Sequence, residues 1–421
     1  MSGDAMDTEQ IRQQFPALER RVNGQAVAYF DGPGGTQVPR AVVDAIVNYL
    51  YGHNANAGWS YPSSQETAGL IDSARQAVAC FLNADASEVV FGNNMTTLTF
   101  KLAQVLGPIY GPDAEIVVNE LEHHANVGPW VELGRQTGAK IRVAKMDPTT
   151  GQIDWPDFES LCNRQTRLIS IGAASNALGT INDVARAAEL ARSVGAQLFV
   201  DAVHFAAHEL IDVQAMGCDF LACSAYKFYG PHVGILFVRN ELLSSLEFPR
   251  LDRAPSSPPA RAETGTRNHE GIAGVGATVD FLASLGGDGD RRQRLASCFG
   301  TLHASGSQLV KQLWDGLSAI EGVRVFGPPP EAPRTPTVSF SIDGTLAEAV
   351  SRQLAEEAIF VSHGDFLALT VVERLELAET GLVRAGCACY TTAEEVQRLL
   401  DAVGRIAHRG AARQVAVSPA P

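Results

Sequence analysis

The sequence predicts an α/β protein with a mainly parallel sheet covered by helices on both faces, followed by a smaller α+β domain. Between residues 68 and 245, short apolar runs alternate with segments of helical periodicity. The composition then changes, because residues 250–262 are rich in proline and serine and are expected to form a long loop. Beyond that loop, helix-like and strand-like segments alternate again in a shorter stretch of chain.

Segments with apolar positions three or four residues apart are expected helices, and short runs of β-branched and aromatic residues are expected strands. In the first part of the chain the expected helices are 68–82, 97–107, 127–138 and 185–196. The expected strands there are 88–92, 114–119, 140–147, 167–174, 196–203, 219–225 and 234–239. In the second part we expect helices at 274–285, 298–320, 346–358 and 393–407, and strands at 323–327, 337–342 and 381–390.

These patterns suggest how the chain divides into domains. Its 421 residues exceed what one hydrophobic core usually serves, about 250–300 residues. We expect an N-terminal segment, 1–25, that packs with the small domain, and a large domain, 26–284. The small C-terminal domain is expected at 285–409, and residues 410–421 are expected to be disordered.

Composition and charge exclude several classes of partner. The net charge is −14 without any long Lys/Arg block, which argues against nucleic acid and anionic membrane surfaces. With no long apolar run and no signal-peptide pattern at the start, we expect a soluble, cytoplasmic protein. The seven scattered cysteines are expected to be reduced thiols. Cys387 and Cys389 alternate in the expected strand and would share a face, but no second pair at ligand spacing accompanies them, so no metal is expected.

Two residues point to a cofactor. Asp201 ends one apolar strand, and Lys227 follows the next. Because the carboxyl ends of parallel strands meet at one edge of a sheet, both side chains should face the same crevice. Enzymes that use pyridoxal 5′-phosphate (PLP) need such a lysine for a Schiff base and such a carboxylate for the pyridine nitrogen.

Six segments, two of which contain Asp201 and Lys227, make the link to PLP enzymes more specific. They are EHHAN at 122–126 with Pro129 and Trp130, SNALGT at 175–180, DAVH at 201–204, SAYKFYGP at 224–231, GTR at 265–267, and RAG with YTTAEEV at 384–396. In this order they resemble the class V aminotransferase family of fold type I PLP enzymes, close to the cysteine desulfurases. The resemblance covers residues 30 to about 400 and implies a seven-stranded sheet and a homodimer with shared active sites.

The resemblance implies a role for each matching residue. Lys227 is expected to hold PLP and then act as general acid and base, His123 to stack on the pyridine ring, and Asp201 to pair with the pyridine nitrogen. The other expected cofactor contacts are Met95, Thr96, Asn176, His204, Ser224, Tyr226 and, toward the neighbouring subunit's phosphate, Thr266. The expected substrate contacts are Gln37, Asn176, His363, Phe366 and Arg384, of which the arginine would bind the α-carboxylate.

The sequence also departs from the pattern. His204 stands where the motif has Gln, and Tyr226 where it has His. In residues 361–369, where cysteine desulfurases carry the cysteine that accepts sulfur, our alignment places Leu367. Leucine cannot accept sulfur, so that half of a desulfurase mechanism is expected to be missing.

The expected activity is that of a PLP enzyme that forms an external aldimine with an amino acid and stabilises a carbanion. A lyase of the carbon–sulfur β-elimination type is the leading reaction. Epimerisation, transamination and decarboxylative carbon–carbon bond formation use the same electron sink and stay open. An alternative of another class is an inactive scaffold or a sulfur-relay partner.

Overall fold

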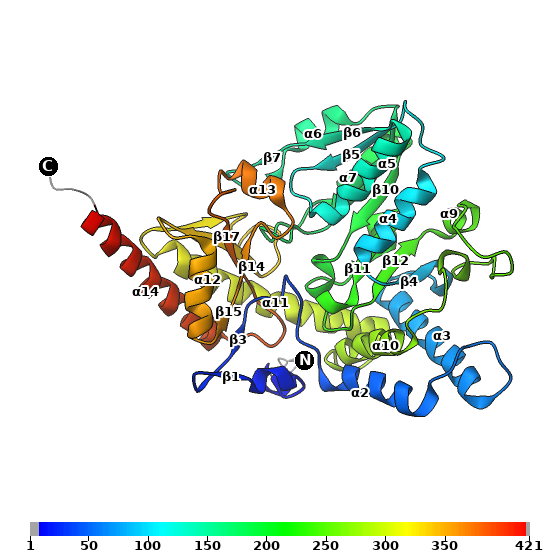
Figure 1. The fold of residues 1–421 in the computed structure, drawn as a ribbon, viewed down its shortest axis with the longest axis horizontal. Coiled ribbons are helices and arrows are strands. Elements are labelled where there is room, and N and C mark those ends of the chain that lie inside the picture. The colour runs from blue at the N-terminus through cyan, green and yellow to red at the C-terminus, as the bar shows by residue number, and fades with distance from the viewer. Residues whose placement is uncertain (1–7, 418–421) are drawn as a thin grey trace.

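The computed structural model describes residues 8–417, and Figure 1 shows a large part built on one sheet beside a smaller part built on another. The larger sheet has seven strands in the order β4-β12-β11-β10-β9-β5-β6. They are β4 (Val89–Gly92), β12 (Gly234–Val238), β11 (Phe220–Ser224), β10 (Gln197–Asp201), β9 (Thr166–Gly172), β5 (Glu115–Asn119) and β6 (Lys140–Ala144). Neighbouring strands are parallel, except that β12 is antiparallel to β11 and β4. The predicted α/β fold with a mainly parallel seven-stranded sheet is confirmed.

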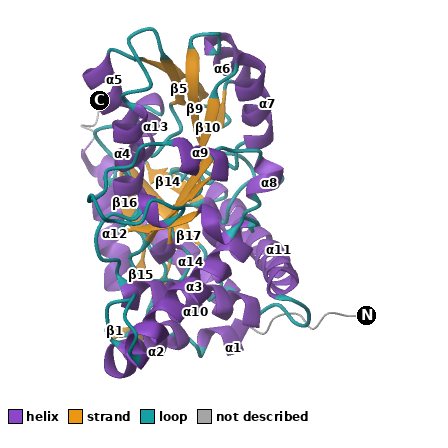
Figure 2. Cartoon of the chain, turned by 90° about the vertical axis from the view of Figure 1, so that its right-hand side faces the viewer, coloured by secondary structure: helices purple, strands orange, loops and turns teal. Residues whose placement is uncertain are grey.

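Helices cover both faces of this sheet (Figure 2). One face packs against α4 (Met95–Leu106) and α5 (Gly128–Thr137), and the other against α3 (Pro62–Leu82), α7 (Val184–Val194) and α10 (His269–Ser284). Successive side chains of a strand point to opposite faces, so Phe199 of β10 joins the first core and Val200 the second. Because both faces are buried, the central strands are mostly apolar, which is why they were recognisable in the sequence, whereas the edge strand β6 is largely exposed and carries Lys140 and Arg142.

The smaller sheet is antiparallel, in the order β13-β14-β17-β16. Its strands are β13 (Val323–Phe326), β14 (Thr337–Ile342), β17 (Leu382–Gly386) and β16 (Ser362–Gly364). Its core is shared with α11 (Arg291–Ser318), α12 (Ala347–Glu356) and α14 (Ala393–Val417). Helix α14 continues through most of 410–421, where we predicted disorder; residues 418–421 lie outside the described part of the chain.

One strand prediction was wrong at its end. The strand predicted at 381–390 stops at Gly386, so Cys387 and Cys389 do not share a strand face. The chain turns there instead, because the Thr391 hydroxyl accepts a hydrogen bond from the amide of Ala388, and the Thr391 amide donates to the Ala388 carbonyl.

The remaining elements are short. The helices are α1 (Thr8–Arg12), α2 (Arg40–Asn48), α6 (Trp155–Leu161), α8 (Val213–Met216), α9 (Asn240–Ser245) and α13 (Leu369–Arg374). The strands are β1 (Arg21–Val22), β2 (Gln25–Ala26), β3 (Ala28–Tyr29), β7 (Met146–Asp147), β8 (Gln152–Ile153) and β15 (Ile359–Phe360). The segment 250–262 is irregular apart from a single 3-10 turn at Ala260–Ala262.

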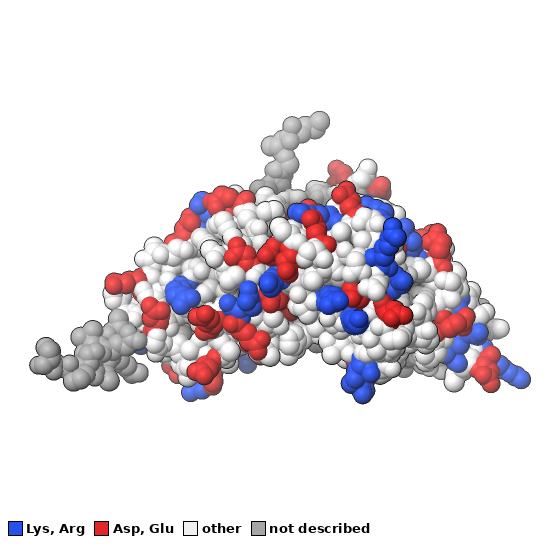
Figure 3. Space-filling view, turned by 90° about the horizontal axis from the view of Figure 1, so that it is seen from above, with Lys and Arg blue, Asp and Glu red and all other residues white. Residues whose placement is uncertain are grey.

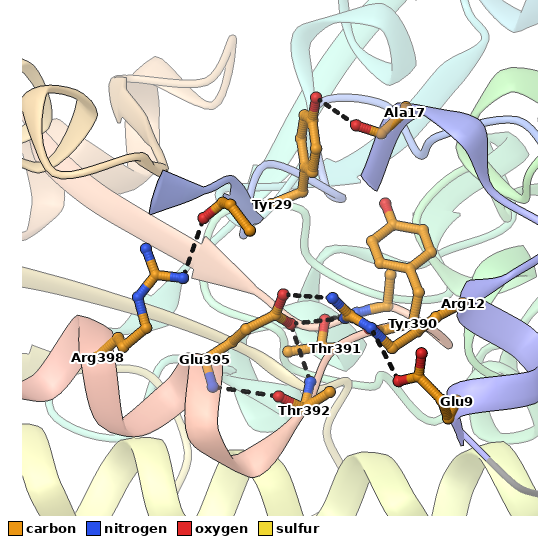
Figure 4. Close-up of polar contacts among 11 residues, drawn as sticks. Glu9, Arg12, Ala17, Tyr29, Tyr390, Thr391, Thr392, Glu395 and Arg398 are labelled. Carbon is orange, nitrogen blue, oxygen red and sulfur yellow. Dashed lines mark hydrogen bonds and ion pairs between the residues drawn. The ribbon is translucent and has the colours of Figure 1, made fainter. Parts of the chain in front are cut away.

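The N-terminal segment is attached to the start of α14 (Figure 4). Arg12 forms an ion pair with Glu395, with Nη2 and Oε1 3.0 Å apart, and also donates to the carbonyl of Tyr390. The ring of Phe15 packs edge-on against Tyr390 and also against Tyr229, which lies two residues after Lys227. Residues 12–15 therefore contact both the smaller part of the molecule and the lysine loop.

Acidic and basic side chains are interspersed on the face seen in Figure 3. Among the described residues, no helix is both long enough and apolar enough to cross a membrane.

Candidate active site

A cavity of about 520 Å³ opens at the carboxyl ends of the central strands. Gly172, Asp201 and Ser224, the last residues of β9, β10 and β11, line it together with the first turn of α4. Of the predicted site residues, the cavity lining contains Met95, Thr96, His123, Asn176, Asp201, His204, Ser224, Tyr226 and Lys227. This is the edge of a parallel sheet where ligands usually bind.

Asp201 is buried at the end of β10, in register with Gly172 on one side and Ala222 on the other. Its Oδ1 accepts a hydrogen bond of 2.9 Å from the amide of Val203. Burial raises the pKa of Asp201 to about 6, although that hydrogen bond and the charge of Lys227 act in the opposite direction. A buried carboxylate of this kind is suited to bind a protonated ring nitrogen.

Lys227 lies in a 3-10 turn, Ala225–Lys227, directly after β11. Its Nζ donates to the carbonyls of Pro33 (2.5 Å) and Gly34 (3.0 Å). Burial first, and then the charge of Arg384, lower the pKa of Lys227 to about 7. At neutral pH a large share of the amine is therefore unprotonated and able to act as a nucleophile.

His123 precedes the 3-10 turn His124–Asn126, and its Nδ1 accepts a hydrogen bond of 3.0 Å from the amide of Ala125. Burial, Lys227 and Arg384 lower the pKa of His123 to about 4. The ring is thus neutral, with its proton assigned to Nε2. A neutral imidazole in the cavity wall is suited to stack on a flat aromatic ring.

The first turn of α4 also lines the cavity. Asn94 caps the helix, because its Oδ1 accepts from the amide of Thr97 at 2.9 Å. The amide of Met95, an expected cofactor contact, donates to Oγ of Ser224 at 2.9 Å. The amide of Thr96 has no acceptor within the helix, as is general for a first turn. A helix start with hydroxyl groups around it favours an anionic group such as phosphate.

His204 is buried, with Nε2 3.0 Å from Oγ1 of Thr335 and 3.2 Å from Oγ1 of Thr337. Its ring lies edge-on to His208, with centroids 5.2 Å apart. Burial lowers the pKa of His204 well below the usual value, so the ring is neutral. A hydrogen bond from His204 to a cofactor oxygen stays a prediction.

Arg384 lies in β17 and is buried without an ion pair among the described residues. Its Nη1 donates to the carbonyl of Asn176 (2.8 Å), its Nη2 to Oγ of Ser362 (3.3 Å), and its Nε has no partner. The guanidinium packs 4.1 Å from the ring centroid of Phe366. Burial lowers the pKa of Arg384 to about 9, opposed by the nearby charge of Asp31. A buried cation without a carboxylate partner favours an anionic ligand.

Phe366 and Leu367 lie in a strained stretch of the 361–369 segment, with φ angles of 57° and 56° that non-glycine residues rarely adopt. The segment is not a loop throughout, because β16 occupies Ser362–Gly364. The carbonyl of Leu367 accepts from the amide of His124 at 2.7 Å, but its side chain is 61% exposed. The carbonyl of Phe366 accepts from Nδ2 of Asn176 at 2.9 Å. This segment therefore covers Arg384 and adjoins the cavity wall.

The cavity lining contains none of the seven cysteines. Cys387 and Cys389 instead line a separate hollow of about 30 Å³ beside His208 and His303. Burial raises the pKa of Cys387 to about 12 and raises that of Cys389 as well, so neither is a ready thiolate.

Four predicted residues besides Arg384 lie outside the cavity lining. The backbone N–H of Gln37 donates to the hydroxyl of Tyr390 at 3.1 Å, His363 is exposed, and Phe366 covers Arg384. Thr266 lines a different hollow, of about 330 Å³, with Trp59 and Arg267.

Two titratable residues of the cavity lining, Glu122 and His232, had no role predicted from the sequence. Glu122 is buried and accepts from the amide of Gly172 and Nδ2 of Asn126, each at 2.7 Å, and from Nδ2 of Asn119. Burial raises the pKa of Glu122 to about 8, with the charge of Asp201 adding to the effect. The signal for Glu122 was its place beside His123 in the EHHAN segment. The signal for His232 was weaker: it lies only five residues after Lys227 in the sequence.

Comparisons with known proteins agree with this geometry. A family model described as Aminotransferase class-V matches residues 28–399. A cysteine desulfurase of Klebsiella pneumoniae is 34% identical over 94% of this chain and 98% of its own length. A cysteine desulfurase of Synechococcus elongatus is 32% identical over 95% of this chain, which spans 64% of that protein. The apo structure of the cysteine desulfurase from Thermococcus onnurineus NA1 superposes with a TM-score of 0.88 at 28% identity, covering 97% of this chain and all of that one.

Proposed function

Because the chain belongs to the class V aminotransferase family of PLP-dependent enzymes, we propose that it is a lyase that cleaves a carbon–sulfur bond at the β-carbon of an amino acid. One observation carries the proposal: Lys227, Asp201 and His123 line a single cavity whose lining includes no cysteine thiol. The three residues are the groups that PLP chemistry requires. The lack of a cysteine in the lining means that the cavity has no sulfur acceptor of the kind a desulfurase uses.

The cavity lining offers a partner for each functional group of PLP. Bound PLP supplies an electron sink that makes bonds at the α- and β-carbons of an amino acid labile. Asp201 would hold the ring nitrogen, His123 would cover the ring face, and the start of α4 with Ser224 would hold the phosphate. The side chain of Lys227 would anchor the cofactor.

Lys227 also serves as the proton carrier in this proposal. Its pKa near 7 lets the amine give up a proton and take one back at neutral pH. The carbonyls of Pro33 and Gly34 hold Nζ on the side of the glycine loop 31–38. In this proposal the same lysine removes the α-proton of a bound amino acid and returns a proton to the leaving sulfur.

Arg384 would bind the substrate α-carboxylate. Its Nε lacks a partner, and the ring of Phe366 shields one face of the guanidinium from water. A carboxylate would meet a buried charge that the protein itself leaves unpaired. Like Arg384 and Phe366, His363 and Gln37 lie outside the cavity lining, and they are proposed here as further substrate contacts.

Carbon–sulfur cleavage in this chain would be an elimination, because a persulfide needs a thiolate near the substrate sulfur. Purified enzyme with L-cysteine should release pyruvate, sulfide and ammonia in equal amounts, without alanine. Alanine with a persulfide on any cysteine of the chain would overturn the proposal and assign a desulfurase. Release of CO₂, a different keto acid or a racemised substrate would assign one of the other PLP reactions.

The cofactor anchor is tested separately. Lys227→Ala should abolish both the visible absorbance of the lysine-linked cofactor and all turnover, whereas Lys101→Ala, a lysine of α4 outside the cavity lining, should keep both. If borohydride still fixes PLP to the Lys227→Ala variant, another lysine is the anchor. A wild-type protein without any bound PLP would favour an inactive scaffold.

We further propose a cytoplasmic homodimer with shared active sites and without nucleic-acid or membrane partners. Support for the dimer comes from a cluster of exposed apolar side chains, which we call the α2 patch: Val43, Val47, Leu50, Tyr51, Trp59 and Tyr61. Thr266 lines the hollow beside this patch and does not line the active-site cavity of its own subunit. This position is consistent with a contact to the phosphate in a second copy. Seven free cysteines are consistent with a reducing compartment.

A further inference from the structure

His232 stands at the mouth of the cavity, between the lysine turn and the start of β12. It is exposed, yet its ring is held in place, because it stacks on Tyr226 with centroids 4.7 Å apart and planes inclined by 13°. The ring of Tyr226 packs closely against the glycine loop 31–38. A Cβ atom added to Gly35 would lie only 3.4 Å from that ring. The imidazole therefore has a defined position beside a residue of the cavity wall.

The phosphate end of the cavity is poor in positive charge. The basic side chains in the lining are Lys227, His123, His204 and His232. Lys227 is the cofactor anchor in the proposed function, and burial keeps His123 and His204 neutral. Within one subunit, a phosphate at the start of α4 would otherwise meet neutral donors: the amide and hydroxyl of Thr96 and the hydroxyls of Ser224 and Tyr226. The amide of Met95 is already taken by Ser224.

We propose that His232 is a ligand of the PLP phosphate and supplies a positive charge that the rest of the cavity lining of its own subunit does not provide at the start of α4. An imidazole donates an N–H group in either protonation state, and its protonated form adds a charge-assisted hydrogen bond. The stack on Tyr226 fixes the plane of the His232 ring, and both residues line the same cavity. Tyr226 stands where the resembling motif has His, and the imidazole of His232 lies six positions further along the chain.

The proposal rests on PLP occupying this cavity, as in the proposed function, but not on which reaction follows. It is tested with apoenzyme and two ligands, PLP and pyridoxal, which differ only in the phosphate. His232→Gln should weaken PLP binding about tenfold or more and leave pyridoxal binding unchanged, measured by the visible absorbance of the lysine-linked cofactor. His232→Lys should recover part of the preference for PLP, because it restores a cation.

Two controls make the result specific. His408→Gln removes an exposed imidazole on α14 and should alter neither affinity. Tyr226→Leu removes the stack as well as the phenol and should weaken PLP more than Tyr226→Phe does, because phenylalanine keeps the ring.

The outcomes separate the two proposals. If His232→Gln binds PLP as tightly as the wild type, His232 is not a phosphate ligand, and the PLP assignment stands. Equal weakening of PLP and pyridoxal would also overturn the inference, because it would mean that the variant disturbs the cavity and not the phosphate contact. If the wild type binds neither ligand, the PLP assignment fails.

Discussion

Burial of a single amine decides what Lys227 can do at neutral pH. A solvated lysine is almost wholly protonated there and is a poor nucleophile. In this cavity the loss of water around Nζ, and secondly the charge of Arg384, lower its pKa to about 7. Asp201 and Asp31 act in the opposite direction but do not outweigh burial. The position at the end of β11 thus turns an ordinary surface residue type into a reactive one.

The rate at which apoenzyme captures PLP should therefore depend on pH in a defined way. Only the unprotonated amine attacks the aldehyde, so the rate should rise with pH through about 7 and level off above it. Stopped-flow absorbance from pH 5.5 to 9 would follow this, at PLP concentrations that keep capture rate-limiting. A rate still rising steeply at pH 9 would show that Lys227 titrates near the value of a solvated lysine.

Asp201 acts through charge, and an isosteric change should reveal this. Asp201→Asn keeps the size and the hydrogen bond from the amide of Val203, so PLP should still bind. Turnover should fall about a hundredfold or more, because a neutral amide no longer stabilises a protonated pyridine nitrogen. Steady-state kcat together with bound-PLP absorbance measures both effects. A variant with near-native kcat would assign Asp201 a purely structural role.

At the scale of elements, the N-terminal segment joins parts of the fold that are far apart in sequence. Arg12 of α1 binds Glu395 and the carbonyl of Tyr390, and the amide of Gln37 donates to the hydroxyl of Tyr390 (Figure 4 shows the Arg12 contacts). Glu395 also accepts from the amide of Thr392 and so caps α14. One buried carboxylate therefore serves both the helix start and the attachment of the N-terminal segment.

This pair should show non-additive energetics. Its two side chains are 17% and 11% exposed, so Arg12→Met leaves Glu395 partly buried without its cation and should cost about 1–3 kcal/mol. Glu395→Gln keeps the cap on α14, and the double variant should be less destabilised than the sum of the single ones. Urea unfolding measures this, with Arg352→Met as control, since its pair with Glu348 is largely exposed and should contribute under about 1 kcal/mol. Additive losses would mean that Arg12 and Glu395 are not coupled.

At the scale of the whole molecule, the α2 patch gathers exposed apolar side chains within the stretch from α2 to the start of α3. Tyr51 is 89% exposed and Trp59 is 63% exposed, although both are large hydrophobic side chains. Large exposed patches of this kind usually mark an interface. The neighbouring hollow contains Thr266 and Arg267, so a second copy seated on the patch would bring polar groups toward the cavity of its partner.

The protein should accordingly sediment as a dimer, and Leu50→Glu with Tyr51→Glu should convert it to a monomer. Charges placed in an apolar interface oppose association, because they lose hydration without gaining a partner. Leu251→Glu is the matched control, since Leu251 is 75% exposed and lies outside the patch. Sedimentation velocity distinguishes the species. A wild type that stays monomeric at micromolar concentration, or a dimer that survives both charges, would rule out this interface.

The sequence by itself determined the seven-stranded sheet and the two residues at its strand ends, Asp201 and Lys227. Strands buried on both faces are apolar throughout, and parallel strands end at one edge, so both features follow from local pattern. Within the site, the resemblance predicted the nine residues in the cavity lining, most of which follow a strand or begin a helix.

Tertiary structure alone decided features that depend on segments distant in sequence. The unpaired guanidinium of Arg384, the exposed side chain of Leu367 and the end of β17 before Cys387 each depend on contacts with other parts of the chain. The buried carboxyl of Glu122 likewise depends on β9, which supplies the amide of Gly172. Solvation and pairing determine charge and reactivity, and both are set by neighbours that only the folded chain brings together.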